Sequence, residues 1–314
     1  MISLRYHVIS IGAVFLALAL GVLLGSTTLS DSLLSGISGQ KAQLGEQVTD
    51  LQAQRNALNA QLSDADRFAT GIGPLAVRGL LNQRTVVIVE TATASQADES
   101  ALADLIKASG ADITGTLQLT QAFSNPNRAD QLNNMVTQLI PAGARLPVAS
   151  DAGTLTGGLL GDLLLLNKQN DKPQATATER AAALSALASA GFIKPAAANA
   201  QPAQLAVVLT GGAQTGPTAG DNATMLANFA TQLAKTSAAT VLAGTAGSAN
   251  GNGPLGVVRA TPAATQALST VDNTNTAAGR VVTILALQKQ LAGTPGAYGT
   301  AANAQSPAPN PTAS

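Results

Sequence analysis

The chain has 314 residues, of which 46% are hydrophobic, 11% charged and 2% aromatic, and its formal net charge is zero. The hydrophobic content excludes a chain that is disordered as a whole, and the balanced charge lacks the basic excess of nucleic-acid-binding proteins, so we expect no nucleic-acid partner. Cysteine is absent and the one histidine, His7, lies near the N-terminus. Thiolate chemistry and histidine-based catalysis therefore lack candidate residues in the rest of the chain. We predict neither an enzyme nor a cofactor.

The first 30 residues predict a transmembrane anchor. No formally charged residue lies between Tyr6 and Ser30, and residues 8–24 are dominated by apolar side chains, which suits the roughly 20 residues that a spanning helix needs. A cleaved secretory signal is the alternative, although its apolar region is usually only about 7–15 residues long. Because Arg5 precedes the apolar segment and Asp31 follows it, we expect a cytoplasmic N-terminus and an extracytoplasmic remainder, held by a single pass through the cell membrane.

Small side chains recur every four residues within the expected anchor, at Ala13, Ala17, Gly21 and Gly25. On a helix they form a narrow stripe along one face, and such a stripe lets two membrane helices approach closely. Alanine and glycine are also common in transmembrane helices in general. The stripe therefore has two interpretations, a packing surface or ordinary composition.

Residues 31–70 predict a coiled coil. Apolar side chains recur at two positions of a seven-residue repeat over about four repeats, and they form the seam of Leu34, Ile37, Leu44, Val48, Leu51, Leu58 and Leu62. Lys41 and Arg55 occupy the second of these positions, where they lower stability but restrict register and strand number. We interpret the seam as the contact of a parallel homodimer that continues the small-residue stripe. The alternative is an amphipathic helix that packs on its own globular domain.

Residues 71–292 predict an α/β domain with a mostly parallel sheet, because short apolar runs alternate with helical patterns. Gly71, Gly73 and Pro74 are expected to end the preceding helix, and the Gly-, Pro- and Ala-rich sequence from residue 293 to 314 predicts a disordered tail. The expected strands are 85–89, 113–119, 205–209 and 240–243, and the expected helices are 97–109, 127–139, 154–166, 179–190, 223–233 and 279–291.

Three local features of this domain are candidates for a site. Glycines follow two expected strands, in Leu209-Thr-Gly-Gly and Leu242-Ala-Gly-Thr-Ala-Gly-Ser, where open α/β sheets usually bind ligands. Neither loop matches a phosphate or dinucleotide motif, so tight turns are the competing interpretation. The acidic cluster of Asp98, Glu99 and Asp104 is interpreted as a solvated helix face, and Asp272 with Asn273 as the brace of a turn before the last helix.

Several segments, in order along the chain, resemble the mycobacterial copper transport protein B family. They are MISLRYHVISIGAVFLALALGVLLGS, LSDSLL, TGTLQLTQAF (114–123), VLTGG (208–212), TVLAG (240–244), STVDN (269–273), GRVVTILAL (279–287) and Tyr298-Gly299. The resemblance implies an actinobacterial envelope protein with a role in copper efflux or homeostasis and a pore in the outer membrane. The same family includes cell-division proteins of the SteB type, which pair with a membrane partner that influences peptidoglycan hydrolysis.

The residues themselves predict no metal ligands. Cu(I) prefers Cys and Met, and imidazole also binds copper, but the methionines Met1, Met135 and Met225 lie far apart and His7 lies at the membrane boundary. Met135 and Met225 belong to apolar helical patterns, which favours a place in the core. A barrel pore needs many alternating strands of about ten residues, and this chain instead alternates strands with helices. Any conducting path would run through assembled N-terminal helices.

Overall fold

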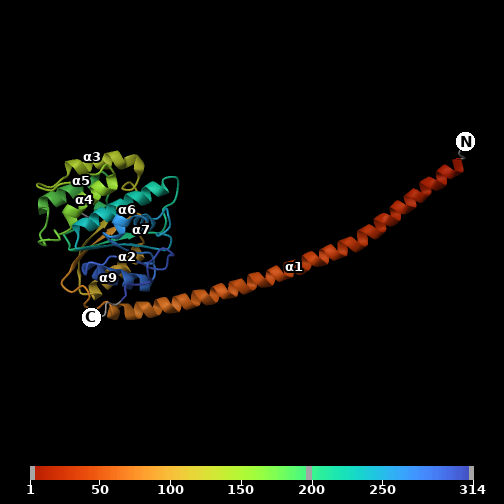
Figure 1. Ribbon diagram of the computed structural model, residues 1–314, viewed down its shortest axis with the longest axis horizontal. Helices are drawn as coiled ribbons and strands as arrows, with labels where there is room; N and C mark the ends of the chain where they lie inside the picture. Colours follow the sequence, from red (N-terminus) through yellow and green to blue (C-terminus); the bar gives the residue numbers. More distant parts are fainter. Residues whose placement is uncertain (1–3, 196–199, 311–314) are drawn as a thin grey trace. The chain divides into compact units, whose positions relative to one another are not determined.

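The computed structural model describes residues 4–195 and 200–310, except for the side chains of residues 4, 26–39 and 42. The chain divides into two compact units, Met1–Ala65 and Asp66–Ser314. Helix α1 runs from Leu4 to Ala76 and therefore extends into the second unit (Figure 1).

The expectation that Gly71, Gly73 and Pro74 end this helix is wrong, because α1 continues to Ala76. Pro74 lies in the last turn, where its missing backbone N–H removes one helical hydrogen bond close to the end of α1. Gly73 has a packing role instead, since a Cβ atom built on it would lie 3.0 Å from Cγ2 of Val281. The glycine lets the end of α1 approach the closing helix of the domain.

In the described part of the chain, parallel strands form one six-stranded sheet in the order β2-β1-β3-β4-β5-β6. Every residue of β3 and β4 is buried, as expected for parallel strands that are covered on both faces. The predicted α/β class with a mostly parallel sheet is thereby confirmed. The strands are β1 Thr85–Glu90, β2 Asp112–Gln118, β3 Leu205–Thr210, β4 Ala239–Gly244, β5 Ser269–Val271 and β6 Ala297–Tyr298.

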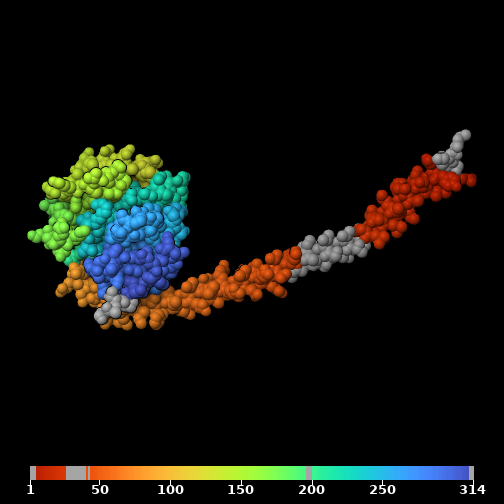
Figure 2. Space-filling model, in the orientation of Figure 1, coloured from red at the N-terminus to blue at the C-terminus, as the bar shows by residue number. Residues whose placement is uncertain are grey.

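Helices cover both faces of the sheet (Figure 1). The core on one face contains residues of α3 to α7, and the core on the other face contains residues of α2 and α9. Figure 2 shows the same division on the surface, with α3 to α6 in yellow-green to teal and the last part of the chain in blue. The helices are α2 Gln96–Ala108, η1 Pro126–Arg128, α3 Ala129–Gln138, α4 Ala152–Leu164, α5 Ala177–Ser189, α6 Ala219–Thr236, α7 Pro254–Ala260, α8 Pro262–Thr265 and α9 Ala277–Leu291.

Helix α4 is the buried helix that its LLGDLLLL segment predicts, and it packs closely on α6. Gly153, Gly157 and Gly161 recur every four residues on the contact face. A Cβ atom on Gly157 would lie 2.7 Å from the backbone oxygen of Phe229, and one on Gly161 would lie 2.7 Å from Oγ1 of Thr236. Glycine is therefore required for this close approach of the two helices.

The folded unit extends beyond residue 293, where the sequence predicts the start of a disordered tail. Ala297 and Tyr298 form β6 and are 7% and 6% exposed. The backbone N–H of Gln305 donates to the carbonyl of Ala297, and Gly299 donates to Ser306. The segment from 293 to 310 is thus part of the domain, while residues 311–314 of the expected tail lie outside the described residues.

Candidate functional site

The first candidate functional region is the apolar part of α1. Residues Arg5–Gly25 have a mean hydropathy of 2.6 and form a helix that is long and apolar enough to cross a membrane. The small-residue stripe of Ala13, Ala17, Gly21 and Gly25 lies within it, and a Cβ atom on either glycine would meet nothing within 4 Å. The surface that the stripe would offer to a second helix is therefore open in the single chain. Its role as a packing surface stays a prediction.

The predicted coiled-coil seam lies on the same helix. Leu34 and Ile37 lie among the residues whose side chains are not described, and the other members of the seam are exposed by 52–68%. These exposed members are Leu44, Val48, Leu51, Leu58 and Leu62. A row of large apolar side chains that remains solvent-exposed is typical of a surface that binds a partner. The structure of one chain leaves the dimer a prediction.

The two candidate copper ligands of the α/β domain, Met135 and Met225, are packing residues. Met225 is buried and Met135 packs against the same core cluster, as their helical patterns predict. His7 lies on the exposed apolar part of α1, and Met1 lies outside the described residues. Among the described residues, no group of three or more His, Cys, Asp or Glu side chains is arranged to hold a metal ion.

The two glycine-rich loops follow β3 and β4, as predicted, and their glycines allow loops to pack on each other. A Cβ atom on Gly211 would lie 2.5 Å from the backbone oxygen of Thr93, in the loop after β1. One on Gly212 would lie 2.7 Å from the backbone oxygen of Ala246, in the loop after β4. These glycines therefore act in loop packing. The residues that follow them, Ala213 to Thr215, border a cavity.

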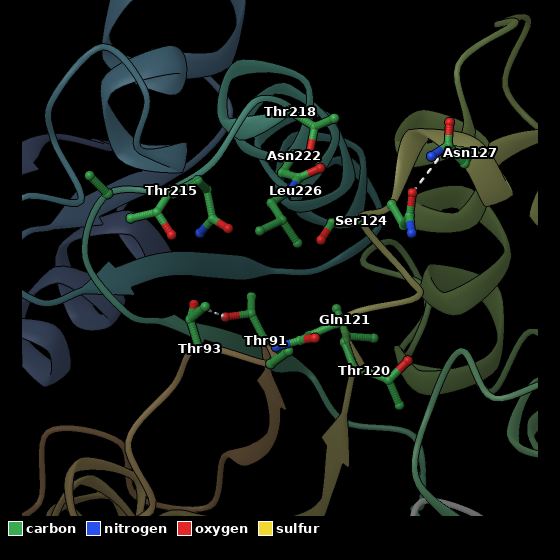
Figure 3. Close-up of a pocket in the computed structure, with 15 residues that line it drawn as sticks. Thr91, Thr93, Thr120, Gln121, Ser124, Asn127, Thr215, Thr218, Asn222 and Leu226 are labelled. Atoms are coloured by element: carbon green, nitrogen blue, oxygen red, sulfur yellow. Dashed lines mark hydrogen bonds between the residues drawn. The ribbon is translucent and has the colours of Figure 1, made fainter.

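This cavity, of about 410 Å³, lies at the carboxyl ends of β1, β2 and β3. In the sheet, β1 lies between β2 and β3, so the chain proceeds from β1 to one side and then returns to continue on the other side. The strand order changes direction here, and we call the space the switch-point cavity. Open α/β sheets bind ligands preferentially at such a point. Figure 3 shows the loop side chains of Thr91, Thr93 and Gln121 across the cavity from Thr218, Asn222 and Leu226 of the α6 region.

A second hollow of about 390 Å³ adjoins the switch-point cavity and shares Thr91, Leu119 and Gln121 with it. Glu90, at the end of β1, lines this hollow and is 5% exposed. Burial raises the pKa of the Glu90 carboxyl, and a hydrogen bond from Gln118 opposes this effect. Sequence analysis singled out the glycine loop after β3, which borders the switch-point cavity, but not the other lining, since it comes from segments far apart in the chain.

The acidic cluster does not converge on a shared site. Asp98 pairs with Arg280 at 3.3 Å, and its side chain is 14% exposed, so for this residue the interpretation as a solvated face is wrong. Asp104 is solvent-exposed beside Lys107, at 4.0 Å, as that interpretation requires. Glu99 accepts a hydrogen bond from the side chain of Gln96. The cluster therefore stabilises α2 and its contact with α9.

Asp272 has a structural role, although a different one from that expected of it. It is 2% exposed and pairs with Nη1 of Arg259 at 2.7 Å. It also accepts hydrogen bonds from the backbone N–H of Thr300, at 2.7 Å, and of Ala301, at 3.2 Å. The turn before α9 is braced by Asn273, whose carbonyl accepts from the hydroxyl of the helix N-cap, Thr276. Asp272 instead fastens the C-terminal segment.

Comparison with known proteins covers nearly the whole chain. The family described as "Copper transport outer membrane protein, MctB" matches residues 1–309. The protein named "Copper transporter MctB" of Mycobacterium tuberculosis (strain ATCC 25618 / H37Rv) is 39% identical over 315 residues, which cover 98% of each chain. The protein of the same name from Mycobacterium leprae (strain TN) is 38% identical over 299 residues, covering 93% of this chain and 94% of its own.

Proposed function

The chain belongs to the MctB family of copper transport outer membrane proteins, and we propose that it acts in copper efflux or homeostasis as a membrane-anchored protein of the cell envelope. The family match over residues 1–309 is the observation that carries this proposal. The apolar segment Arg5–Gly25 supports the anchoring. The positive charge of Arg5, at the start of this segment, favours a cytoplasmic N-terminus, with the α/β domain outside the cytoplasm.

Copper is the cargo in this proposal. Cu(I) is held by thiolate, thioether and imidazole groups, and the chain has no cysteine and a single histidine. Met135 and Met225 are engaged in packing one core cluster. We therefore propose that the role in copper handling depends on an assembly, formed by several copies of the chain or with a membrane partner. A location in the outer membrane, as the family's name has it, is the alternative to this anchoring in the cell membrane.

Growth of a deletion strain on increasing copper tests the proposal. We expect the strain to become copper-sensitive and the full chain to restore resistance. A chain that lacks residues 1–30 would lose its anchor and should fail to restore resistance if it is made at the same level. Copper resistance that is unchanged by the deletion would contradict the proposed function.

A second function, a dimeric scaffold, is favoured by the exposed seam of α1. Five apolar side chains of that seam are exposed by 52–68%, within a segment that carries Lys41 and Arg55 at seam positions. In a parallel pair the apolar seam side chains would bury one another. Lys41 and Arg55 of each chain would disfavour other registers. We propose that the dimer presents its α/β domains to a protein that controls cell division or peptidoglycan hydrolysis.

The oligomeric state of the full chain tests this second function. Light scattering in detergent micelles should give a dimer, and the double substitution of Leu51→Asn and Leu58→Asn should weaken it more than tenfold by removing the central seam contacts. Ala53→Asn and Ala60→Asn place the same side chains on the opposite face of the helix, since two residues turn it by about 200°. This control should remain dimeric. A monomeric wild-type chain would contradict the scaffold.

A further inference from the structure

We propose that the switch-point cavity binds a neutral saccharide, through hydroxyl and carboxamide side chains of the loops after β1, β2 and β3. The proposal concerns a ligand of the α/β domain and does not depend on the role in copper handling. It rests on the cavity's place in the fold, on the chemistry of its lining, and on buried polar atoms that have no partner among the described residues.

The lining of the cavity is polar and carries no charged side chain. Threonine, serine, asparagine and glutamine provide most of it, and four alanine and leucine residues provide the rest. Hydroxyl and carboxamide groups donate and accept hydrogen bonds without a net charge. A cavity lined in this way suits a ligand that is itself neutral and rich in hydroxyl groups.

Gln214 supplies an unused donor. Its side chain lines the cavity and is 7% exposed, yet its Nε2 has no hydrogen-bond partner in the described part of the chain. Its backbone is fixed on both sides, because its N–H donates to the carbonyl of Asn252 at 2.9 Å and its carbonyl accepts from Nδ2 of Asn252 at 2.8 Å. An unsatisfied buried donor costs about 1–3 kcal/mol, so a side chain held in this position calls for a ligand acceptor.

Glu90 supplies an unused acceptor in the adjoining hollow. Its Oε1 is buried without a partner within residues 4–195 and 200–310, while its other oxygen accepts from Gln118. The adjoining hollow and the switch-point cavity share the loop residues after β1 and β2. A ligand that extends across both must therefore accept a hydrogen bond at one end and donate one at the other. Each hydroxyl group of a saccharide does both.

A phosphate or nucleotide fits this cavity less well, because the loops use their own backbone N–H groups. The N–H of Thr91 donates to the carbonyl of Leu209 at 2.8 Å, and that of Gly211 donates to the hydroxyl of Thr93 at 3.2 Å. At the start of α6, the N–H of Ala219 donates to the carbonyl of Gly216 at 3.2 Å, although Thr218 supplies no side-chain cap. Anion sites at helix termini depend on free N–H groups, and in the adjoining hollow the carboxyl of Glu90 offsets the positive charge of Lys194.

The test uses the full chain in lipid nanodiscs, because glycoside detergents carry sugars. Saturation-transfer NMR with maltose and with chitobiose as probes should show saturable binding of at least one of them. Ala92→Trp places a large ring at a position that lines both hollows and should abolish the signal. Ala97→Trp, on the exposed part of α2, is the matched control and should retain it. Gln214→Leu should weaken binding about 3- to 10-fold by removing the donor.

Three results would overturn the proposal. The first is that neither maltose nor chitobiose binds the wild-type chain above the level seen with the Ala92→Trp chain. Binding that survives Ala92→Trp would place the ligand elsewhere. The third is that inorganic phosphate or flavin mononucleotide binds the wild-type chain in preference to the saccharides and that this binding is lost with Ala92→Trp. The cavity would then take an anion. Circular dichroism of each variant establishes that loss of binding is not loss of the fold.

Discussion

The buried ion pair of Arg259 and Asp272 should be the main fastening of the C-terminal segment. Both side chains are nearly inaccessible, at 3% and 2% exposure, and their atoms lie 2.7 Å apart. Arg259 also donates to the carbonyl of Tyr298 in β6 at 2.7 Å, while Asp272 accepts from the backbone of Thr300. The substitution Asp272→Ala leaves a buried guanidinium without its carboxylate and frees two backbone donors.

We expect Asp272→Ala to lower the free energy of unfolding by about 3–5 kcal/mol, which is the loss when one partner of a buried pair is removed. Asp98→Ala is the matched control. It breaks the pair with Arg280, whose atoms lie 3.3 Å apart with side chains 13–14% exposed. Arg280 keeps its hydrogen bond to the carbonyl of Thr274, so this loss should be about 1 kcal/mol.

Hydrogen exchange of the full chain, followed by mass spectrometry, separates the two effects. Peptides of β5 and β6 should exchange roughly 100-fold faster or more in the Asp272→Ala chain, since each 1.4 kcal/mol corresponds to a tenfold change. The Asp98→Ala chain should show less than about a tenfold change. Equal and small effects of the two substitutions would refute the reasoning, because burial would then not distinguish the pairs.

Three further substitutions have expected effects on stability. Asp162→Asn should raise the free energy of unfolding by about 1–3 kcal/mol above pH 6, because burial raises the pKa of Asp162 from 3.8 to about 6. The folded state holds this proton more tightly, so the wild type loses stability as pH rises from about 4 to about 6. The stability gained by the variant should therefore vanish below about pH 4. A pH-independent difference between the two chains in denaturant titrations would contradict this. Thr176→Ala removes the N-cap of α5, which forms a capping box with Glu179, and should lower stability by about 0.5–2 kcal/mol, measured by the exchange of α5 peptides; unchanged protection there would argue against the cap. Leu160→Ala empties a fully buried position of α4 and should lower the free energy of unfolding by about 2–5 kcal/mol, measured by denaturant titration. A loss below about 1 kcal/mol would show that the site collapses around the smaller side chain.

The elements that sequence analysis found are those with a strong local signal. The apolar runs of β1, β3 and β4 are buried on both faces, and such strands read as continuous apolar sequence. Helix α2 carries its own start signal, because Ser95 accepts from the backbone of Asp98. Helix α4 is dense in leucine, and its length excludes a second membrane span.

The elements that it missed depend on contacts distant in sequence. Strands β5 and β6 have three and two residues, too few for a periodic pattern. Ser269 is buried in β5 because the backbone N–H of Gly296 donates to its hydroxyl. The Pro- and Ala-rich C-terminal segment has the composition of a disordered tail, yet Arg259 holds Tyr298 and Asn303 in place. Composition does not reveal such a tether.

The candidate sites divide in the same way. The predicted anchor and seam are one-dimensional patterns, so both predictions were made from the sequence without knowledge of the fold. The switch-point cavity depends on the order in which strands adjoin, which places the loops after β1, β2 and β3 together. The glycines after β3 signalled this loop cluster. The partnerless donor of Gln214 became visible only in three dimensions.

Cellular copper tests the central claim most directly. Elemental analysis should compare the wild-type strain, the deletion strain and the deletion strain complemented with the full chain, all grown in the same copper concentration. A protein of copper efflux or homeostasis predicts that copper accumulates in the deletion strain and returns to the wild-type level on complementation. Equal copper content in the three strains would contradict the account.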